Sequence, residues 1–249
     1  MKRRKIIYIF PITTVFLFGL IIGSFLNVCI YRIQRKKSIV FPSRSYCPIC
    51  KKPISWYDNI PLLSFILLKA RCRSCGRPIS IRYPFVELLT GLLFVFFFLK
   101  FGLEKTYFFN IILIGYMIVL TFIDIDKKEV PDSIVLLLFA TGFIFNVFNV
   151  NNEAGLFDSF AGAAAAGLLI YTLNYVTAGK IGEGDIKLFS AIGSCAGLKP
   201  VLEIIALAFI IGGAVSAVLV FMRIYKRSDK IAFVPFISAA FVIRSLFIT

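Results

Sequence analysis

Histidine is absent from the 249 residues, and this absence removes several classes of active site. Ser-His-Asp and Cys-His nucleophile systems, HExxH metalloprotease sites and metal centres with histidine ligands are all excluded. Catalysis by this chain must therefore use Asp, Glu, Cys, Lys, Tyr, Ser or Thr side chains.

Charged residues are also few, at 16% of the sequence, whereas hydrophobic residues make up 59%. This balance lies outside the usual range of soluble domains and favours a protein embedded in a lipid bilayer. A membrane-spanning helix needs about 20 apolar residues, because each backbone amide must find its hydrogen-bond partner within the segment. The composition therefore predicts an all-α, polytopic bundle of membrane helices.

Apolar runs along the chain predict about eight transmembrane helices. They cover residues 6–30, 85–99, 107–123, 134–150, 157–176, 186–198, 201–222 and 231–248. The first run follows a Lys-Arg cluster, as in a signal peptide, but it is too long for a cleaved apolar core. No small-residue cleavage pattern follows it, so we predict a first transmembrane helix.

The net charge of +15 has an ordinary origin in the cytoplasmic loops of a membrane protein, and we expect no nucleic-acid partner. The positive-inside bias places the long loop 31–83 in the cytoplasm. The same side then holds the basic residues Lys127, Lys128, Lys180, Lys187, Arg223, Lys226, Arg227 and Lys230. This topology puts the N-terminal Lys-Arg-Arg-Lys cluster on the opposite side, against the bias.

Four of the six cysteines form two C-x-x-C pairs in the loop 31–83, Cys47 with Cys50 and Cys72 with Cys75. The surrounding sequences CPICKKPIS and CRSCGRPIS repeat one local pattern. Two such pairs supply the four thiolates of a closed tetrahedral zinc site, in which no position remains for a catalytic water. Disulfides or a redox-active dithiol are the alternatives, and a cytoplasmic location disfavours structural disulfides.

Two acidic residues stand at the ends of apolar runs on the predicted cytoplasmic side. Asp124 follows the run 107–123, and Asp185 precedes the run 186–198. Carboxylates near the bilayer are costly to ionise, so they indicate function, and two brought close together share one proton as in aspartic proteases. Gly182 and Gly184 would let a substrate backbone approach Asp185.

The simpler alternative is that these acids are solvated loop charges. The neighbouring acids Asp126, Glu129, Asp132 and Glu183 are expected to be such flanking charges, with nearby lysines, Lys187 among them, as their counter-charges.

Several motifs occur in a particular order along the chain. They are GSFLNV at 23–28 followed by Tyr31-Arg32, the two C-x-x-C pairs, Arg82-Tyr83-Pro84 with Glu87, IDID at 123–126 followed by Pro131-Asp132, and GEGDIK at 182–187. This series resembles the prepilin peptidase family, the bifunctional leader peptidases and N-methyltransferases of type IV pilus, type II secretion and competence systems. The resemblance extends over nearly the whole chain.

The resemblance implies that Asp124 and Asp185 are the catalytic carboxylates of a GxGD-type membrane aspartic peptidase, supported by Gly182, Gly184 and Lys187. It implies cleavage of the short basic leader of prepilin or pseudopilin precursors directly after a Gly. It also implies methylation of the new N-terminal residue with S-adenosylmethionine. No G-x-G-x-x-G stands in a strand-to-helix setting, so the sequence does not indicate which residues bind S-adenosylmethionine.

We therefore predict three parts in a protein of the cytoplasmic (inner) membrane. Residues 1–30 form the first transmembrane helix, residues 31–83 a cytoplasmic four-cysteine zinc domain associated with the methyltransferase, and residues 84–249 the peptidase bundle. Three alternatives are a proton-coupled transporter with Asp124 and Asp185 as proton carriers, a thiol oxidoreductase that uses the C-x-x-C pairs, and a presenilin-like protease.

Overall fold

The computed structural model describes residues 2–42, 44–148, 155–224 and 231–248, and of residues 2–9 only the backbone. Within these ranges every regular element is a helix and no β-strand forms, which confirms the all-α prediction. The elements are α1 (Lys2–Ile33), η1 (Trp56–Asn59), α2 (Leu63–Leu67), α3 (Arg82–Phe101), α4 (Lys105–Lys127), α5 (Asp132–Phe148), α6 (Gly155–Val176), α7 (Glu183–Ala196), α8 (Leu198–Phe221) and α9 (Val234–Phe247). The chain divides into two compact units, residues 1–119 and 120–249.

Five of the described helical segments are long and apolar enough to cross a membrane: Phe10–Ile33, Arg82–Phe101, Lys105–Lys127, Gly155–Val176 and Leu198–Phe221. Two shorter apolar helices, α5 and α9, have 17 and 14 residues. α7 is in neither group, because its 14 residues begin with a charged turn. The chain is thus a multi-pass membrane protein, and eight spans is more than helix length and composition support.

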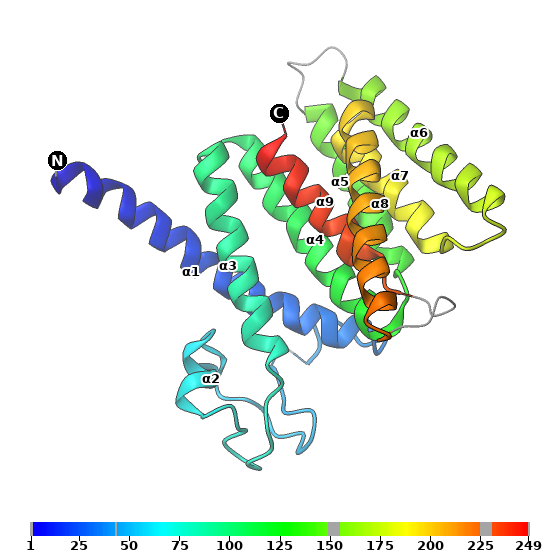
Figure 1. Ribbon diagram of the computed structural model, residues 1–249. Coiled ribbons are helices and arrows are strands. Elements are labelled where there is room, and N and C mark those ends of the chain that lie inside the picture. Colours follow the sequence, from blue (N-terminus) through cyan, green and yellow to red (C-terminus); the bar gives the residue numbers. More distant parts are fainter. Residues whose placement is uncertain (1, 43, 149–154, 225–230, 249) are drawn as a thin grey trace. The chain divides into compact units, whose positions relative to one another are not determined.

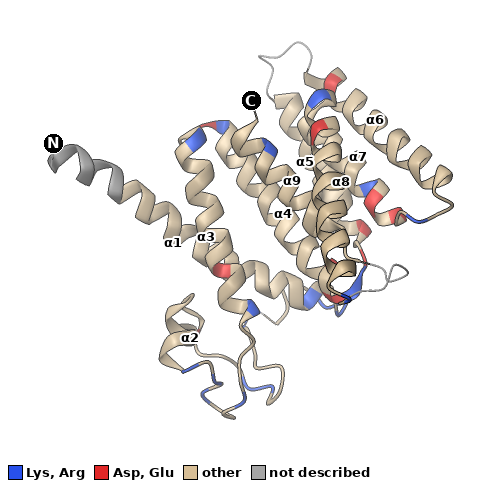
Figure 2. Ribbon diagram, viewed as in Figure 1, with Lys and Arg blue, Asp and Glu red and all other residues tan. Residues whose placement is uncertain are grey.

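Most charged residues lie toward the ends of these helices, and the middle parts of α5, α6 and α8 carry none (Figure 2). This distribution fits helices whose central parts face lipid or one another. Val150 and the basic residues Lys226, Arg227 and Lys230, which entered the sequence predictions, lie outside the described residues, as do the side chains of the N-terminal basic cluster.

In the first unit, α1 and α3 approach each other closely through glycines. A Cβ atom on Gly19 would lie 2.8 Å from the Cα of Gly91, and one on Gly23 would lie 2.7 Å from the Cα of Glu87. Small residues of this kind let membrane helices pack backbone against backbone. The packing brings Glu87 of α3 against α1.

Arg32 fixes the chain where it leaves α1 for the cysteine-containing segment. Its side chain is buried, and its guanidinium donates hydrogen bonds of 2.6–3.3 Å to four backbone carbonyls. The acceptors belong to Ser38, Ile39, Pro42 and Arg44. One guanidinium offers five N–H donors, so a single side chain can hold this whole irregular segment.

In the second unit, α7 packs against α5, α6 and α8 (Figure 1). Gly162 of α6 and Gly193 of α7 bring the two backbones into contact, so that a Cβ atom on either would overlap the other helix. The hydroxyl of Ser159 donates a 2.7 Å hydrogen bond to the carbonyl of Ser194, and the hydroxyl of Ser190 donates one of 2.9 Å to that of Ala163. α7 therefore needs little lipid-facing apolar surface, because other helices surround it.

Candidate functional site

Asp124 lies in the last turn of α4 and is only 6% exposed. Its Oδ2 accepts a 2.9 Å hydrogen bond from the backbone N–H of Val234, and the N–H of Phe233 is a second donor. Both donors belong to the start of α9, where unpaired N–H groups and the helix dipole favour a carboxylate. The hydroxyls of Thr121 and Ser238, 2.7 Å apart, join the same two helices.

Asp185 lies in the first turn of α7, which Gly182 precedes as the N-cap residue. The N–H of Asp185 donates a 3.0 Å hydrogen bond to the carbonyl of Gly182 and closes this turn. A Cβ atom on Gly182 would lie 3.3 Å from the Oδ2 of Asp185, so a side chain there would crowd the carboxylate. The side chain of Asp185 is half-buried and interacts electrostatically with Asp124.

The two motif segments touch each other directly at two further points. A Cβ atom on Gly184 would lie 2.8 Å from the Cβ of Val130, in the connection between α4 and α5. The ammonium of Lys187 lies 2.8 Å from the Oδ1 of Asp132 at the start of α5. Gly184 thus has a packing role that the sequence did not reveal, and Lys187 pairs across the two segments.

The other acidic residues of these motifs differ from Asp124 in their surroundings. Asp126, Glu129, Asp132 and Glu183 are exposed. Exposed acids of this kind are ordinary solvated charges, whereas a buried carboxylate beside a second one has a perturbed proton affinity. Within this group of acids, the geometry therefore singles out Asp124 and Asp185.

Burial raises the pKa of Asp185 to about 7, and the negative charge of Asp124 contributes to this rise. The hydrogen bond with the Gly182 backbone has a smaller, opposite effect and lowers the pKa. Asp185 stands at the start of α7, which is not among the membrane-spanning segments. A carboxyl group with this pKa carries its proton about half of the time at neutral pH, as a general acid must. The arrangement can therefore pair a carboxylate with a carboxylic acid.

The contribution of α9 to this site was not predicted from the sequence. Val234 reaches Asp124 through a backbone N–H, which leaves no side-chain signature, and 110 residues separate the two in the chain. Pro235, near the start of α9, is the one local signal, because proline favours the first turn of a helix.

The four loop cysteines meet in the first unit and form a candidate metal centre. Their sulfur atoms all lie within 4.8 Å of one another, and the Sγ atoms of Cys47 and Cys75 are 3.9 Å apart. Four thiolates about 2.3 Å from one zinc ion in a tetrahedron would be separated by about 3.8 Å, so the donor set fits. The described cysteines form no disulfide, and Cys29 and Cys195 are buried and are not members of this cluster.

The two knuckles have the same backbone geometry, as their repeated sequence suggests. The backbone carbonyl of Cys47 accepts a 2.8 Å hydrogen bond from the N–H of Lys51. The carbonyl of Cys72 accepts an equivalent bond of 2.8 Å from the N–H of Gly76. An isolated antiparallel bridge closes each knuckle, Tyr46 with Pro53 and Arg71 with Pro78. The spacing of the cysteines therefore reflects two equivalent turns that present their sulfur atoms to one point.

Comparison with known proteins places both regions in one family. Residues 17–101 match the model of the bacterial peptidase A24 N-terminal domain, and residues 111–217 match that of the type IV leader peptidase family. The prepilin leader peptidase/N-methyltransferase of Aeromonas hydrophila is 35% identical to this chain over 91% of its length and 87% of the relative's. The chain belongs to the type IV leader peptidase family.

Other prepilin leader peptidase/N-methyltransferases are similarly related. The protein from Legionella pneumophila is 36% identical to this chain, over 89% of this chain's length and 86% of its own length. The protein from Bacillus subtilis (strain 168) is 32% identical, over 95% of this chain's length and 94% of its own length. No solved structure matches the chain.

Membership of the leader peptidase family confirms the resemblance drawn from the motif order and identifies the chain as a membrane peptidase. The first matched segment contains the four cysteines, and the second contains Asp124 and Asp185. Membership does not favour the alternative of a proton-coupled transporter.

Proposed function

We propose that this chain is a membrane aspartic endopeptidase that cleaves the leader of type IV prepilin-like precursors after a Gly, with Asp124 and Asp185 as its catalytic pair. The observation that carries the proposal is the electrostatic interaction of these two carboxyl groups, from the end of α4 and the start of α7, among neighbouring acids that are exposed. The names of the relatives supply the class of substrate.

The surroundings of the two carboxyl groups suggest different roles. Two backbone N–H groups of α9 point to Asp124, which suits an ionised carboxylate that takes a proton from the attacking water. Asp185, with its pKa raised to about 7, is the acid that polarises the scissile carbonyl. The water oxygen adds to that carbonyl, the peptide C–N bond then breaks, and the leaving amine takes up a proton.

The supporting residues keep the two motifs in register. We assign Gly184 to the close contact with Val130, and Lys187 to the ion pair with Asp132. Gly182 leaves open the space beside the Asp185 carboxylate, where a substrate backbone can approach. Each of these residues therefore positions Asp185 or clears its surroundings.

The site suits a substrate that has a basic leader in the cytoplasm and an apolar helix in the lipid, because both aspartates stand at helix ends. We propose that these ends and the cysteine loop face the cytoplasm, and that the chain resides in the inner membrane. The three parts proposed above, residues 1–30, 31–83 and 84–249, would then be the first span, the zinc domain and the peptidase bundle.

Two groups from outside the chain complete this function. Zn²⁺ on Cys47, Cys50, Cys72 and Cys75 would hold the cysteine loop together without taking part in cleavage, since its four ligands leave no open position. S-adenosylmethionine would supply an electrophilic methyl group for the amine that cleavage releases. Substitution Cys72→Ser should lower the zinc content measured by atomic absorption, and full zinc content in this variant would refute the four-thiolate site.

The direct test incubates the purified chain with a prepilin peptide that bears its leader, with and without S-adenosylmethionine, and determines product masses. Asp124→Asn and Asp185→Asn should each abolish cleavage while the protein stays folded in the membrane. Glu183→Gln is the matched control, since this exposed acid lies two residues from Asp185. Its substitution should reduce leader cleavage much less than Asp185→Asn does. Retained cleavage in either Asn variant would remove that aspartate from the mechanism.

A further inference from the structure

Two short helical elements of the first unit, η1 and α2, carry large apolar side chains that are exposed. Trp56 in η1 is 80% exposed, and Ile66 and Leu67 in α2 are 70% and 69% exposed. Leu63, which is also exposed, lies three and four residues before these two, so the three aliphatic side chains share one face of α2. We call this the outer face of α2. Adjoining exposed apolar groups mark an interaction site.

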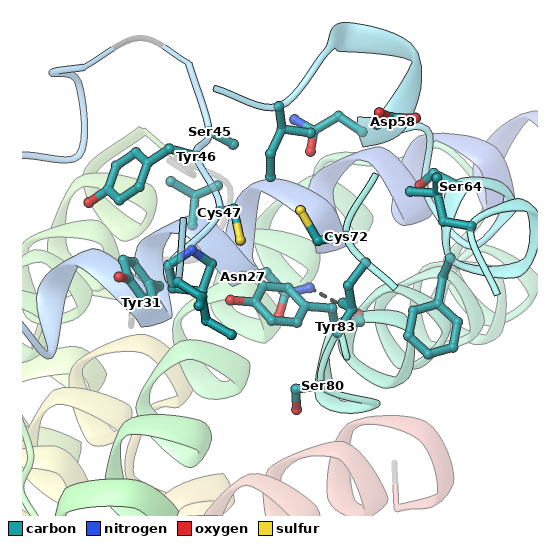
Figure 3. A pocket seen from close by; sticks show the side chains of 18 of the residues that line it. Asn27, Tyr31, Ser45, Tyr46, Cys47, Asp58, Ser64, Cys72, Ser80 and Tyr83 are labelled. Atoms are coloured by element: carbon teal, nitrogen blue, oxygen red, sulfur yellow. Dashed lines mark hydrogen bonds between the residues drawn. The ribbon is translucent and has the colours of Figure 1, made fainter. Parts of the chain in front are cut away.

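The opposite face of α2 is turned toward the protein. Ser64, Phe65 and Leu68 line a pocket of about 500 Å³ together with residues of α1 and α3. Figure 3 shows Ser64 at the wall of this pocket. α2 is therefore packed on one side and exposed on the other, as expected of a helix that lies on a surface.

A hydrogen bond fixes the level of α2 along α3. The N–H of Leu62, the residue before α2, donates a 2.9 Å hydrogen bond to the carboxylate of Glu87. Glu87 follows the first residue of α3, Arg82, by five residues, so it lies about 7.5 Å along the helix. The 20 residues of α3 are about 30 Å long, which is the thickness of the hydrocarbon core of a bilayer. Helices of the membrane interface lie about 5–10 Å deep, so α2 stands at such a level.

η1 is fixed beside the second cysteine knuckle. The guanidinium of Arg73 forms a two-point ion pair with the carboxylate of Asp58, at 2.7 and 2.9 Å, and lies 5.4 Å from the ring centre of Tyr57. The ring of Tyr57 contacts that of Trp56, with 5.7 Å between their centres. Trp and Tyr concentrate at the interface between lipid and water, because their rings are apolar and carry one polar group.

The cysteine segment that carries this surface is strongly basic. Between residues 44 and 81 it contains one acid, Asp58, which pairs with Arg73, and seven exposed basic residues. These are Arg44, Lys51, Lys52, Lys69, Arg71, Arg73 and Arg77. The segment stays positive even with the double negative charge of a zinc ion on four thiolates. An anionic bilayer complements this charge, whereas a second copy of the same surface would repel it.

We propose that η1 and α2 form an interfacial membrane anchor. Trp56 and the outer face of α2 lie among the lipids at the boundary of headgroups and acyl chains, and the basic side chains of the cysteine segment lie at anionic headgroups. The anchor holds the cysteine segment against the bilayer from which α1 and α3 emerge.

The test uses Trp56 as its probe, because it is the single tryptophan of the sequence. The full chain with its zinc is placed in nanodiscs of equal shares of phosphatidylglycerol and phosphatidylcholine, one of which carries brominated acyl chains that quench tryptophan on contact. Brominated phosphatidylglycerol should lower the fluorescence at least about twofold, since an interfacial ring lies about 5–10 Å deep. Brominated phosphatidylcholine should quench less, because basic side chains gather the anionic lipid around the anchor.

Two double variants move the tryptophan. Trp56→Phe with Ile66→Trp places it on the outer face of α2, where it should be quenched as strongly as in the wild type. Trp56→Phe with Ile49→Trp is the matched control, because Ile49 is also exposed and apolar but lies in the first knuckle, outside η1 and α2. It should be quenched much less. The zinc content of each sample shows whether the cysteine segment is folded.

Fluorescence that brominated lipid leaves unchanged, both in the wild type and in the variant with Ile66→Trp, would overturn the anchor. Quenching by acrylamide in the buffer would then show that water covers the surface, and protection from both quenchers would show that another protein chain does. Quenching of the Ile49→Trp control as strong as that of the wild type would overturn the assignment of the contact to η1 and α2. Equal quenching by the two brominated lipids would overturn the role of the basic side chains.

Discussion

The protonation of Asp185 offers the sharpest test of the proposed acid-base roles. If its protonated form polarises the scissile carbonyl, the cleavage rate should follow the protonated fraction of a group with a pKa of about 7. This fraction is about one tenth at pH 8 and about one hundredth at pH 9. Single-turnover cleavage of a prepilin peptide should therefore slow about tenfold for each pH unit above neutrality.

Infrared spectroscopy observes the same proton without substrate, because a protonated carboxyl group has its own C=O stretching band. In the wild type, this band should disappear near pH 7, and Asp185→Asn should lack it. Asp124→Asn removes the second cause of the raised pKa, so the band that remains should disappear at a lower pH. A cleavage rate that stays constant from pH 7 to about pH 9 would refute the assignment of Asp185 as the acid.

Because proton binding and folding are linked, the raised pKa of Asp185 has a predictable effect on the stability of the protein. The folded pKa of Asp185 lies above the ordinary 3.8, so the contribution of this group to folding is fully present below about pH 4 and is lost as the pH rises through 7. The shift of about 3 units corresponds to at most about 4 kcal/mol. Thermal unfolding should therefore show the stability of Asp185→Asn rising relative to that of the wild type between about pH 4 and about pH 7. An equal difference in melting temperature at acid and alkaline pH would contradict the shift.

Four substitutions, three of them at glycines, test other parts of the structure. Gly184→Ala should reduce peptide cleavage at least about tenfold, because the new Cβ would press on Val130 and displace the turn that carries Asp185. Gly213→Ala in α8 is the control. A Cβ atom there meets no atom within 4 Å, so peptide cleavage should stay unchanged. Gly76→Ala should lower the stability of the zinc-loaded protein by about 1 kcal/mol in thermal unfolding, because Gly76 has a φ of +67°. The equivalent Lys51 already has a φ of 58°, and Lys51→Gly should change the melting temperature little, since relief of strain offsets the added flexibility of the unfolded chain. Equal losses of cleavage activity in Gly184→Ala and Gly213→Ala would refute the first explanation. Equal losses of stability in Gly76→Ala and Lys51→Gly would refute the second.

The features that sequence predicted well are those that a short stretch of chain determines. Apolar runs mark the positions of the helices, and the spacing of each C-x-x-C pair is the spacing of one turn. The number of spans was less predictable, because an apolar run does not reveal whether lipid or protein surrounds it. α7 illustrates this, since most residues of its second half are buried among other helices.

The features that sequence did not reveal depend on contacts between distant segments. Gly184 was interpreted as an opening for substrate, yet its nearest neighbour is Val130, more than fifty residues earlier. In the same way, nothing local to Leu62 indicates that its N–H would bond to the carboxylate of Glu87. Such contacts exist only once the helices pack, and the pattern of one segment cannot encode them alone.

The position of Asp185 depends on the whole of α7, because the carboxylate stands at one end and the helix is fixed at the other. Gly142 of α5 makes room for the side chain of Ser194, and the carbonyl of Ser194 accepts hydrogen bonds from Asn146 and Ser159. A helix held in this way moves as a rigid body, so a shift at its buried end would be transmitted to the first turn. The small residues along α5, α6 and α7 therefore help to fix the position of Asp185 at the start of α7, although none of them touches a substrate in the proposed mechanism.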